Sequence, residues 1–229
     1  MAASPSFIAP VFHVGPVAIT NTVVATWAIM VVLVLGAWAV THRLKADPGS
    51  WQVVMEGVVS AIEDAIRAML PVQYREVMPF IGTLWIFILV ANLASLLPGV
   101  RSPTGDLSLT AGLAILVFLA VHWYGVRMNG LRSYLVHYLK PNPILLPFHL
   151  ISEVSRTVAL AVRLFGNIFS LQMAALLVLL VAGFLAPVPV LMLHIVEAVV
   201  QAYIFGMLAL VYIAGAIQSQ QLKQQREKE

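Results

Sequence analysis

The chain of 229 residues is 61% hydrophobic and only 10% charged, and its mean hydropathy is +0.93. This composition excludes a soluble globular protein, and a formal net charge of +3 gives no basis for binding nucleic acid. Cysteine is absent, which excludes disulfides and thiolate metal sites. The sequence therefore predicts an all-α integral membrane protein.

Five mostly apolar segments are long enough to cross about 30 Å of hydrocarbon, which takes roughly 20 helical residues. We expect residues 1–229 to form a single membrane domain. Its predicted crossings are residues 17–41, 77–98, 107–126, 144–182 and 190–217. The last two segments exceed the length of one upright crossing, so we expect them to form a steeply tilted pair.

Residues 51–70 differ from these crossings. Their apolar residues recur every three or four positions, while Glu56, Glu63, Asp64 and Arg67 occupy other faces. This pattern predicts an amphipathic helix lying on the membrane surface. A connecting helix in solvent is the alternative interpretation.

The basic residues predict the orientation. With the N-terminus outside, ten Lys and Arg residues fall in inside regions, whereas the outside loops hold only Arg101. Loops rich in Lys and Arg stay on the cytoplasmic side of a membrane. We therefore expect a cytoplasmic C-terminus.

Arg163 stands in an apolar helical segment, and the 33 residues that follow carry no charged side chain. An arginine at that depth costs at least roughly 2.5–3.5 kcal/mol, so it indicates a functional charge that faces an ion or a carboxylate. No acid lies three or four residues away, and Arg156 and Asn167 share its helix face. Glu153 is placed to pair with Arg156. A structural buried ion pair is the alternative role for Arg163.

The last helix carries a polar stripe. His194, Glu197 and Gln201 follow at spacings of three and four residues, and Tyr212 returns to the same azimuth. The stripe indicates a proton wire or a water-filled cleft, or else a hydrogen-bonded cluster that only joins helices. The six histidines are scattered, and no nucleophile motif occurs. We expect no metal site and no catalytic site.

Three motifs together resemble subunit a of F-type ATP synthases over residues 20–217. They are R-L-F-G-N at 163–167, His-x-x-Glu-x-x-x-Gln at 194–201, and N-L-x-x-L-L-P at 92–98. The resemblance implies a non-catalytic stator beside a rotating ring (the c-ring) whose subunits each carry one membrane-buried carboxylate. Two offset half-channels would carry protons to and from that ring, and Arg163 would separate them.

The resemblance also implies partners and site residues. The partners would be the ring, peripheral-stalk subunit b, the rest of the synthase and the lipid of a bacterial inner membrane, with no cofactor. The residues expected in ion translocation are Arg163, Asn167, Gln172, His194, Glu197 and Gln201. Ser95, Asp106 and Ser108 are half-channel candidates on the outer side, Glu153 and Arg156 on the cytoplasmic side, together with Tyr212.

One position departs from the family pattern. Gln172 cannot titrate, whereas the family often carries an acid or histidine there, so we expect Glu197 to supply the missing acid. The ring selects the ion, so a sodium-translocating version is an alternative. A secondary transporter that binds an anionic substrate at Arg163 is less favoured, because the sequence shows no inverted repeat.

Overall fold

The computed structural model describes residues 10–14, 17–42, 49–96, 103–131, 146–183 and 188–226. Their helices are α1 (Asn21–His42), α2 (Ser50–Met69), α3 (Tyr74–Leu93), α4 (Leu107–Asn129), α6 (Leu146–Ala182) and α7 (Val188–Arg226). Two short 3-10 turns, η1 (Ala94–Leu96) and η2 (Pro103–Gly105), lie between α3 and α4. Within the described residues, five helices are long and apolar enough to span a membrane, and α2 is not among them. The predicted all-α membrane fold with five crossings is confirmed.

The N-terminal end differs from the prediction. Strands β1 (Pro10–Val14) and β2 (Val17–Thr20) form an antiparallel hairpin in which Val14 lies opposite Val17. The prediction that the first crossing begins at residue 17 is therefore wrong, because α1 begins at Asn21. An uncharged apolar stretch suits a helix or a strand, and the β-branched residues of β2 favour the strand.

The crossings also differ slightly in length from their predicted ranges. Helix α3 begins three residues earlier than predicted, and α4 continues to Asn129. Helix α7 continues to Arg226, nine residues beyond its predicted end, since Gln, Lys and Arg are good helix formers. The predicted boundaries at residues 98 and 144 lie outside the described residues.

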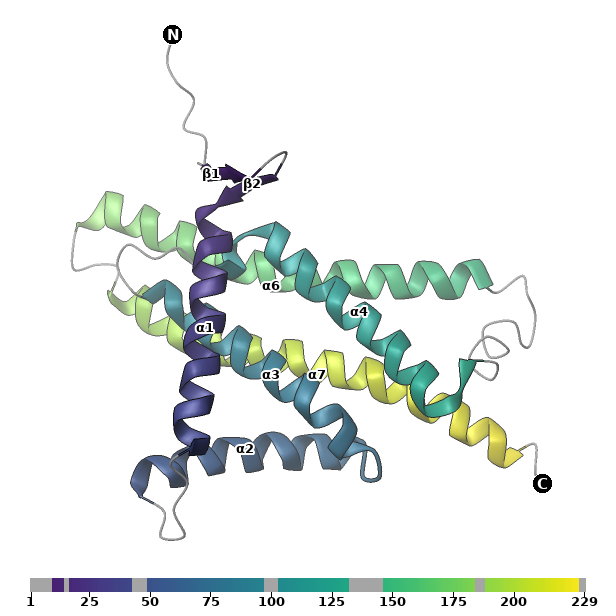
Figure 1. The fold of residues 1–229 in the computed structure, drawn as a ribbon. Coiled ribbons are helices and arrows are strands. Elements are labelled where there is room, and N and C mark those ends of the chain that lie inside the picture. Colours follow the sequence, from purple (N-terminus) through teal and green to yellow (C-terminus); the bar gives the residue numbers. More distant parts are fainter. Residues whose placement is uncertain are drawn as a thin grey trace.

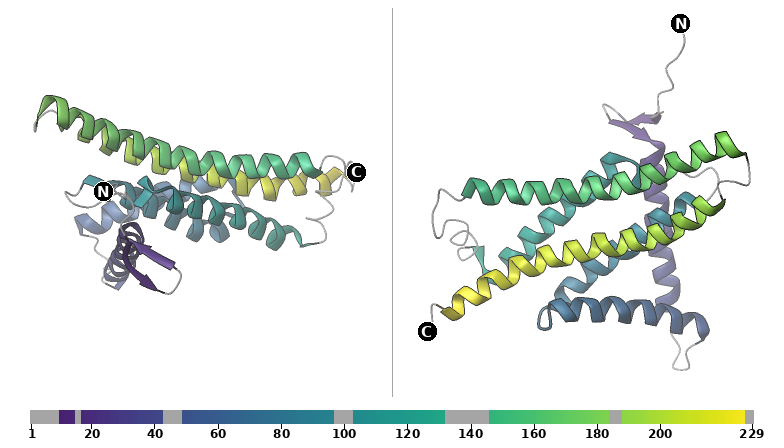
Figure 2. Two further views of the ribbon diagram at one scale, coloured as in Figure 1. Left: turned by 90° about the horizontal axis from the view of Figure 1, so that it is seen from above. Right: turned by 180° about the vertical axis from the view of Figure 1, so that it is seen from behind.

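The helices form two packed layers with α1 and α2 at the side. Helices α6 and α7 run side by side, and they lie across α3 and α4 (Figure 2). Helix α1 contacts α3 on the far side of that layer, and α2 contacts α3 and α7 (Figure 1). Figure 1 shows that α6 and α7 run across the direction of α1.

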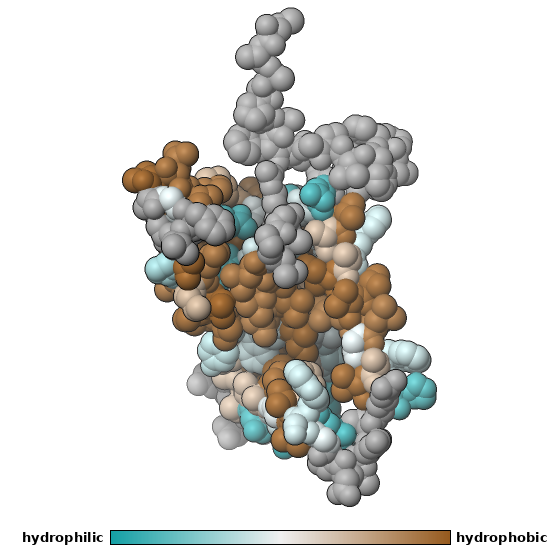
Figure 3. Space-filling model, turned by 90° about the vertical axis from the view of Figure 1, so that its left-hand side faces the viewer, coloured by the Kyte–Doolittle hydropathy of each residue, from teal (hydrophilic) through white to brown (hydrophobic). Residues whose placement is uncertain are grey.

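The apolar surface of the molecule forms a band. Figure 3 shows hydrophobic residues across the middle of one face, with hydrophilic residues mostly toward its ends. Helix α1 is the most exposed crossing, and Val34 and Trp38 keep 68% and 63% of their surface. Such a helix is stable only in contact with lipid or with an apolar partner.

The start of α4 is held by Asp106. Its carboxylate accepts hydrogen bonds from the backbone nitrogen of Ser108 at 2.9 Å and from the Ser108 hydroxyl at 2.7 Å. Partial burial raises the pKa of Asp106, but these bonds and one from Thr22 of α1 outweigh it, so the pKa lies below its ordinary value. The carboxylate therefore caps α4 and joins it to α1.

We expect Asp106→Ala to lower the stability of the protein by about 1 kcal/mol at neutral pH, the usual cost of a lost helix cap. A carboxyl group with a lowered pKa in the folded state stabilises the fold above its unfolded pKa. That charge-dependent contribution is lost as the pH falls from about 4 through the lower pKa of the folded state, so the difference from the parent should shrink over that range to what a neutral cap contributes. Thermal unfolding of the purified protein at several pH values measures this. Asp106→Asn keeps the cap without the charge, and an Ala variant as stable as the parent at neutral pH would contradict the assignment.

Candidate functional site

Arg163 lies on the exposed side of α6. Its neighbours Leu164 and Ile168 are fully buried, so the helix turns its guanidinium away from the packed layers. Among the described residues, Arg163 forms no ion pair within 4.0 Å. This isolated cation agrees with the expectation that its counter-charge is not local.

Directly beside Arg163, α6 and α7 are joined by an amide pair. The Asn167 side-chain nitrogen donates to the side-chain amide oxygen of Gln201, Oε1, at 2.7 Å. Gln201 is only 1% exposed, and its own amide nitrogen has no hydrogen-bond partner among the described residues. A buried donor of this kind is available to a water molecule or to another acceptor.

His194 belongs to a group of polar side chains that we call the histidine cluster, made up of Asn92, Ser95, Thr104 and His194. The imidazole is 4% exposed, and its Nε2 lies 2.6 Å from the Ser95 hydroxyl oxygen. That oxygen also lies 2.7 Å from the Asn92 carbonyl oxygen, to which the hydroxyl can donate. Ser95 has a single hydroxyl hydrogen, so its direction depends on whether Nε2 of His194 carries a proton.

Asn92 ties this cluster to the helices around it. The side chain is fully buried, accepts from the Thr104 hydroxyl at 2.7 Å and donates to the Ala198 carbonyl at 3.4 Å. Gln172 of α6 reaches the same turn, because its amide oxygen would lie 3.0 Å from a Cβ added to Gly105. The cluster thus includes groups from α3, η1, η2 and α7 and borders α6.

Two other candidates of the predicted outer half-channel have a structural role at the edge of this region. Asp106 and Ser108 bond to each other at the start of α4, and Ser108 is exposed. Glu197 lies one turn after His194, is partly exposed, and has no hydrogen-bond or ion-pair partner among the described residues. It is therefore placed as a free carboxyl group rather than as a bonded partner of His194.

A second group, which we call the charged row, crosses α4, α6 and α7 and consists of His122, Glu153, Arg156 and Tyr212. Nε2 of His122 lies 3.3 Å from a carboxylate oxygen of Glu153, and the Arg156 guanidinium lies 5.5 Å from the centre of the Tyr212 ring. The predicted pair of Glu153 with Arg156 is not the contact found. Glu153 pairs across the helix interface, and Arg156 packs on an aromatic face.

The histidine cluster and the charged row lie on opposite sides of Arg163. Helices α6 and α7 run antiparallel, and the contacts between them keep one register. Arg156 and Asn167 are eleven residues apart on α6, and their partners Tyr212 and Gln201 are eleven residues apart on α7. His194 precedes Gln201 by seven residues, so the histidine cluster lies beyond the amide pair. The residues of the polar stripe predicted on α7 all lie on that helix, but His194, Gln201 and Tyr212 contact different partners at different heights, and Glu197 has no hydrogen-bond or ion-pair partner among the described residues.

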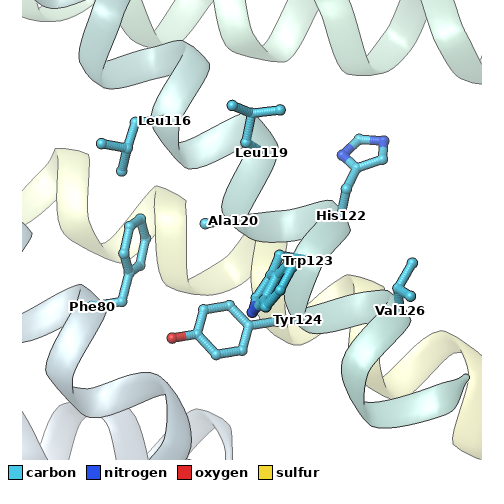
Figure 4. Close-up of a pocket in the computed structure, with 8 residues that line it drawn as sticks. All are labelled: Phe80, Leu116, Leu119, Ala120, His122, Trp123, Tyr124 and Val126. Atoms are coloured by element: carbon cyan, nitrogen blue, oxygen red, sulfur yellow. The ribbon is translucent and has the colours of Figure 1, made fainter.

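Sequence reasoning missed three members of these groups. Asn92 was recognised only as part of a motif, and Thr104 gave no signal. His122 is a single histidine in an apolar crossing, which is itself a sign of function in a membrane. Figure 4 shows His122 beside an apolar groove formed by α3 and α4, with its ring pointing away from Phe80 and Tyr124.

Fold and site together define a multi-pass helical membrane protein whose charged and polar residues occupy two levels within its crossings. That arrangement is typical of proteins that move ions. Comparison with known proteins makes the assignment specific. Residues 23–214 match the model of the family described as ATP synthase A chain.

Curated relatives agree along almost the whole chain. The chain is 62% identical over 218 residues to ATP synthase subunit a 2 of Pelobacter propionicus, covering 95% of this chain and 96% of that protein. It is 58% identical to ATP synthase subunit a of Legionella pneumophila (strain Paris), covering 94% of each. It is 63% identical over 206 residues to ATP synthase subunit a 1 of Hahella chejuensis, covering 90% of this chain and 88% of that protein. The chain belongs to the ATP synthase A chain family, as the sequence motifs predicted.

Proposed function

We propose that this chain is the ion-translocating stator subunit of a rotary ATP synthase, with Arg163 separating two offset half-channels. Membership of the ATP synthase A chain family supports the assignment of this chain as that subunit. The observation that carries the finer proposal is the exposed Arg163, which has no ion pair within the described part of the chain and lies between the histidine cluster and the charged row. The chain itself performs no bond chemistry, and it works with the ring, peripheral-stalk subunit b and the remaining subunits.

The proposed role of Arg163 follows from its charge. A guanidinium keeps its proton at every working pH, and it favours the ionised form of a nearby carboxylate. A ring carboxylate that reaches Arg163 would therefore release its ion before passing. The same fixed charge repels a cation that would otherwise cross directly between the half-channels.

In this proposal the histidine cluster marks the outer half-channel, and the charged row marks the cytoplasmic one. The unpaired amide nitrogen of Gln201 would hold water between His194 and Arg163. Glu197 would supply the acid that Gln172 lacks. Each proton that crosses 100 mV contributes about 2.3 kcal/mol, which drives the rotation.

The orientation is part of the same proposal. The N-terminus and the histidine cluster face outward in a bacterial inner membrane, and the C-terminus and the charged row face the cytoplasm. The exposed surface of α1 is available to lipid and to peripheral-stalk subunit b. We propose protons as the translocated ion. Sodium is the alternative, because the ion-binding site of the ring subunits determines which ion is bound.

A crosslinking experiment tests whether the Arg163 face meets the ring. Ser170 is exposed and lies seven residues after Arg163, on the same face of α6. The natural chain has no cysteine, so Ser170→Cys can carry a single photoreactive maleimide. We expect a covalent product with the ring subunit, identified by mass spectrometry. Ile168→Cys, at a fully buried position, is the matched control. Crosslinks to lipid alone would contradict the stator role.

A further inference from the structure

The contact between His122 and Glu153 is not explained by packing alone. It joins α4 to α6 with a separation of 3.3 Å between Nε2 and a carboxylate oxygen, and the two side chains keep 30% and 20% of their exposure. Ionisable groups are expensive within a membrane crossing, and a pair of them marks an ion or proton pathway more often than a packing contact.

The hydrogen bond on the other side of the imidazole determines which nitrogen of His122 can gain or lose a proton next to Glu153. Nδ1 of His122 lies 2.9 Å from the carbonyl oxygen of Phe118. A carbonyl only accepts, so Nδ1 must carry a hydrogen, and Nε2 is the atom that titrates. A neutral imidazole facing an ionised Glu153 would then bring two lone pairs together. The separation of 3.3 Å is an ion-pair contact that does not meet hydrogen-bond geometry, and it is favourable only when one proton resides on Nε2 or on the carboxylate.

The His122–Glu153 pair lies close enough to Arg163 to exchange protons with the polar groups around that residue. Glu153 precedes Arg163 by ten residues, or about 15 Å of helix. Arg156 follows Glu153 by one turn and lies over Tyr212 of α7, so polar groups continue from the pair toward the exposed face of α6. On α4, Arg127 follows His122 by five residues at the end of the crossing.

We infer that His122 and Glu153 share one exchangeable proton and act as a proton-exchange station between the level of Arg163 and the cytoplasm. This rests on the proposed function. One N–H or O–H bond breaks as the proton leaves for cytoplasmic water, which leaves neutral imidazole and carboxylate. A proton arriving from the rotor side forms the bond again and restores the pair. His122 thereby becomes a proton-handling residue that the family motifs do not indicate.

Glu153→Gln separates this role from a structural one. The glutamine amide can still donate to Nε2 of neutral His122, so the contact between α4 and α6 is kept, but it holds no exchangeable proton. We expect passive proton flux through the membrane sector, with the catalytic head removed and a potassium diffusion potential applied, to fall at least about fivefold. The amount of subunit in the membrane should be unchanged. His42→Gln, which also replaces an ionisable side chain by glutamine but on α1, should leave the flux unaltered.

The exchanged pair, His122→Glu with Glu153→His, supplies the rescue. It restores one acid and one imidazole across the interface, and we expect flux within about twofold of the parent. Flux that stays normal in Glu153→Gln, or is not rescued in an assembled exchanged pair, would overturn the inference. Arg163→Ala in the same membranes keeps the two proposals apart. If Arg163→Ala abolishes coupling while Glu153→Gln leaves the proton flux unaltered, the stator role is supported and the proton-exchange role of His122 and Glu153 is refuted.

Discussion

Arg163→Ala is expected to abolish proton-coupled ATP synthesis, reducing it to the level of membranes that lack the complex. ATP hydrolysis by the detached catalytic head should survive, because the substitution lies within the membrane sector. The reason is electrostatic: without a fixed cation, a ring carboxylate has no cause to release its ion at this point. Synthesis driven by an imposed proton gradient in membrane vesicles measures the effect.

Two further variants sharpen this result. Arg163→Lys keeps a positive charge but replaces a planar guanidinium with a flexible ammonium that can lose its proton when desolvated, so most activity should still be lost. Arg156→Ala removes the same type of side chain from the same face of α6, where it packs on Tyr212. We expect Arg156→Ala to weaken synthesis without abolishing it. Near-normal synthesis in Arg163→Ala would remove the basis of the proposed mechanism.

The second large effect is expected at Gly206. A Cβ added there would overlap the five-membered ring of Trp85, which stacks on Tyr203 and donates to its carbonyl oxygen at 3.2 Å. The indole is 7% exposed and cannot move aside without breaking these contacts. We expect Gly206→Ala to destabilise the protein by about 1–3 kcal/mol and Gly206→Val by more, with loss of the subunit from the membrane.

The chain offers a matched control for this substitution. Gly215 lies on the same helix, and an added Cβ there meets no atom within 4 Å. Gly215→Ala should therefore be tolerated or slightly stabilising. Trp85→Phe makes room beside residue 206, so the double variant should recover membrane levels that Gly206→Ala loses. Immunoblots of membranes and thermal unfolding distinguish these cases. Equal behaviour of the two glycine variants would contradict the close approach.

The crossings could be predicted because each is decided by local sequence. Uncharged segments of sufficient length identify membrane helices, and the charged faces of residues 51–70 identify α2 as different. The strand β2 could not be separated from the first crossing in this way, since hydropathy does not distinguish a helix from a short apolar strand. The extension of α7 past residue 217 was missed because its charged tail has no apolar pattern, although its residues favour helix.

The candidate site was only partly predictable. The depth and isolation of Arg163 follow from the sequence, because the cost of a charge in an apolar helix is a local property. The partners do not follow from it. Ser95 meets His194 from another helix, and Glu153 meets His122 rather than the Arg156 on its own helix. Such pairs depend on the register of packed helices, which no spacing within one segment reveals.

The contacts between α6 and α7 have a consequence for the position of Arg163. Asn167 is fastened to Gln201 four residues after Arg163, and Arg156 rests on Tyr212 seven residues before it. These two supports stand about 16 Å apart along α6, with the isolated cation between them. Interhelical contacts on both sides of Arg163 therefore define the register of α6 against α7 at the height of this charge.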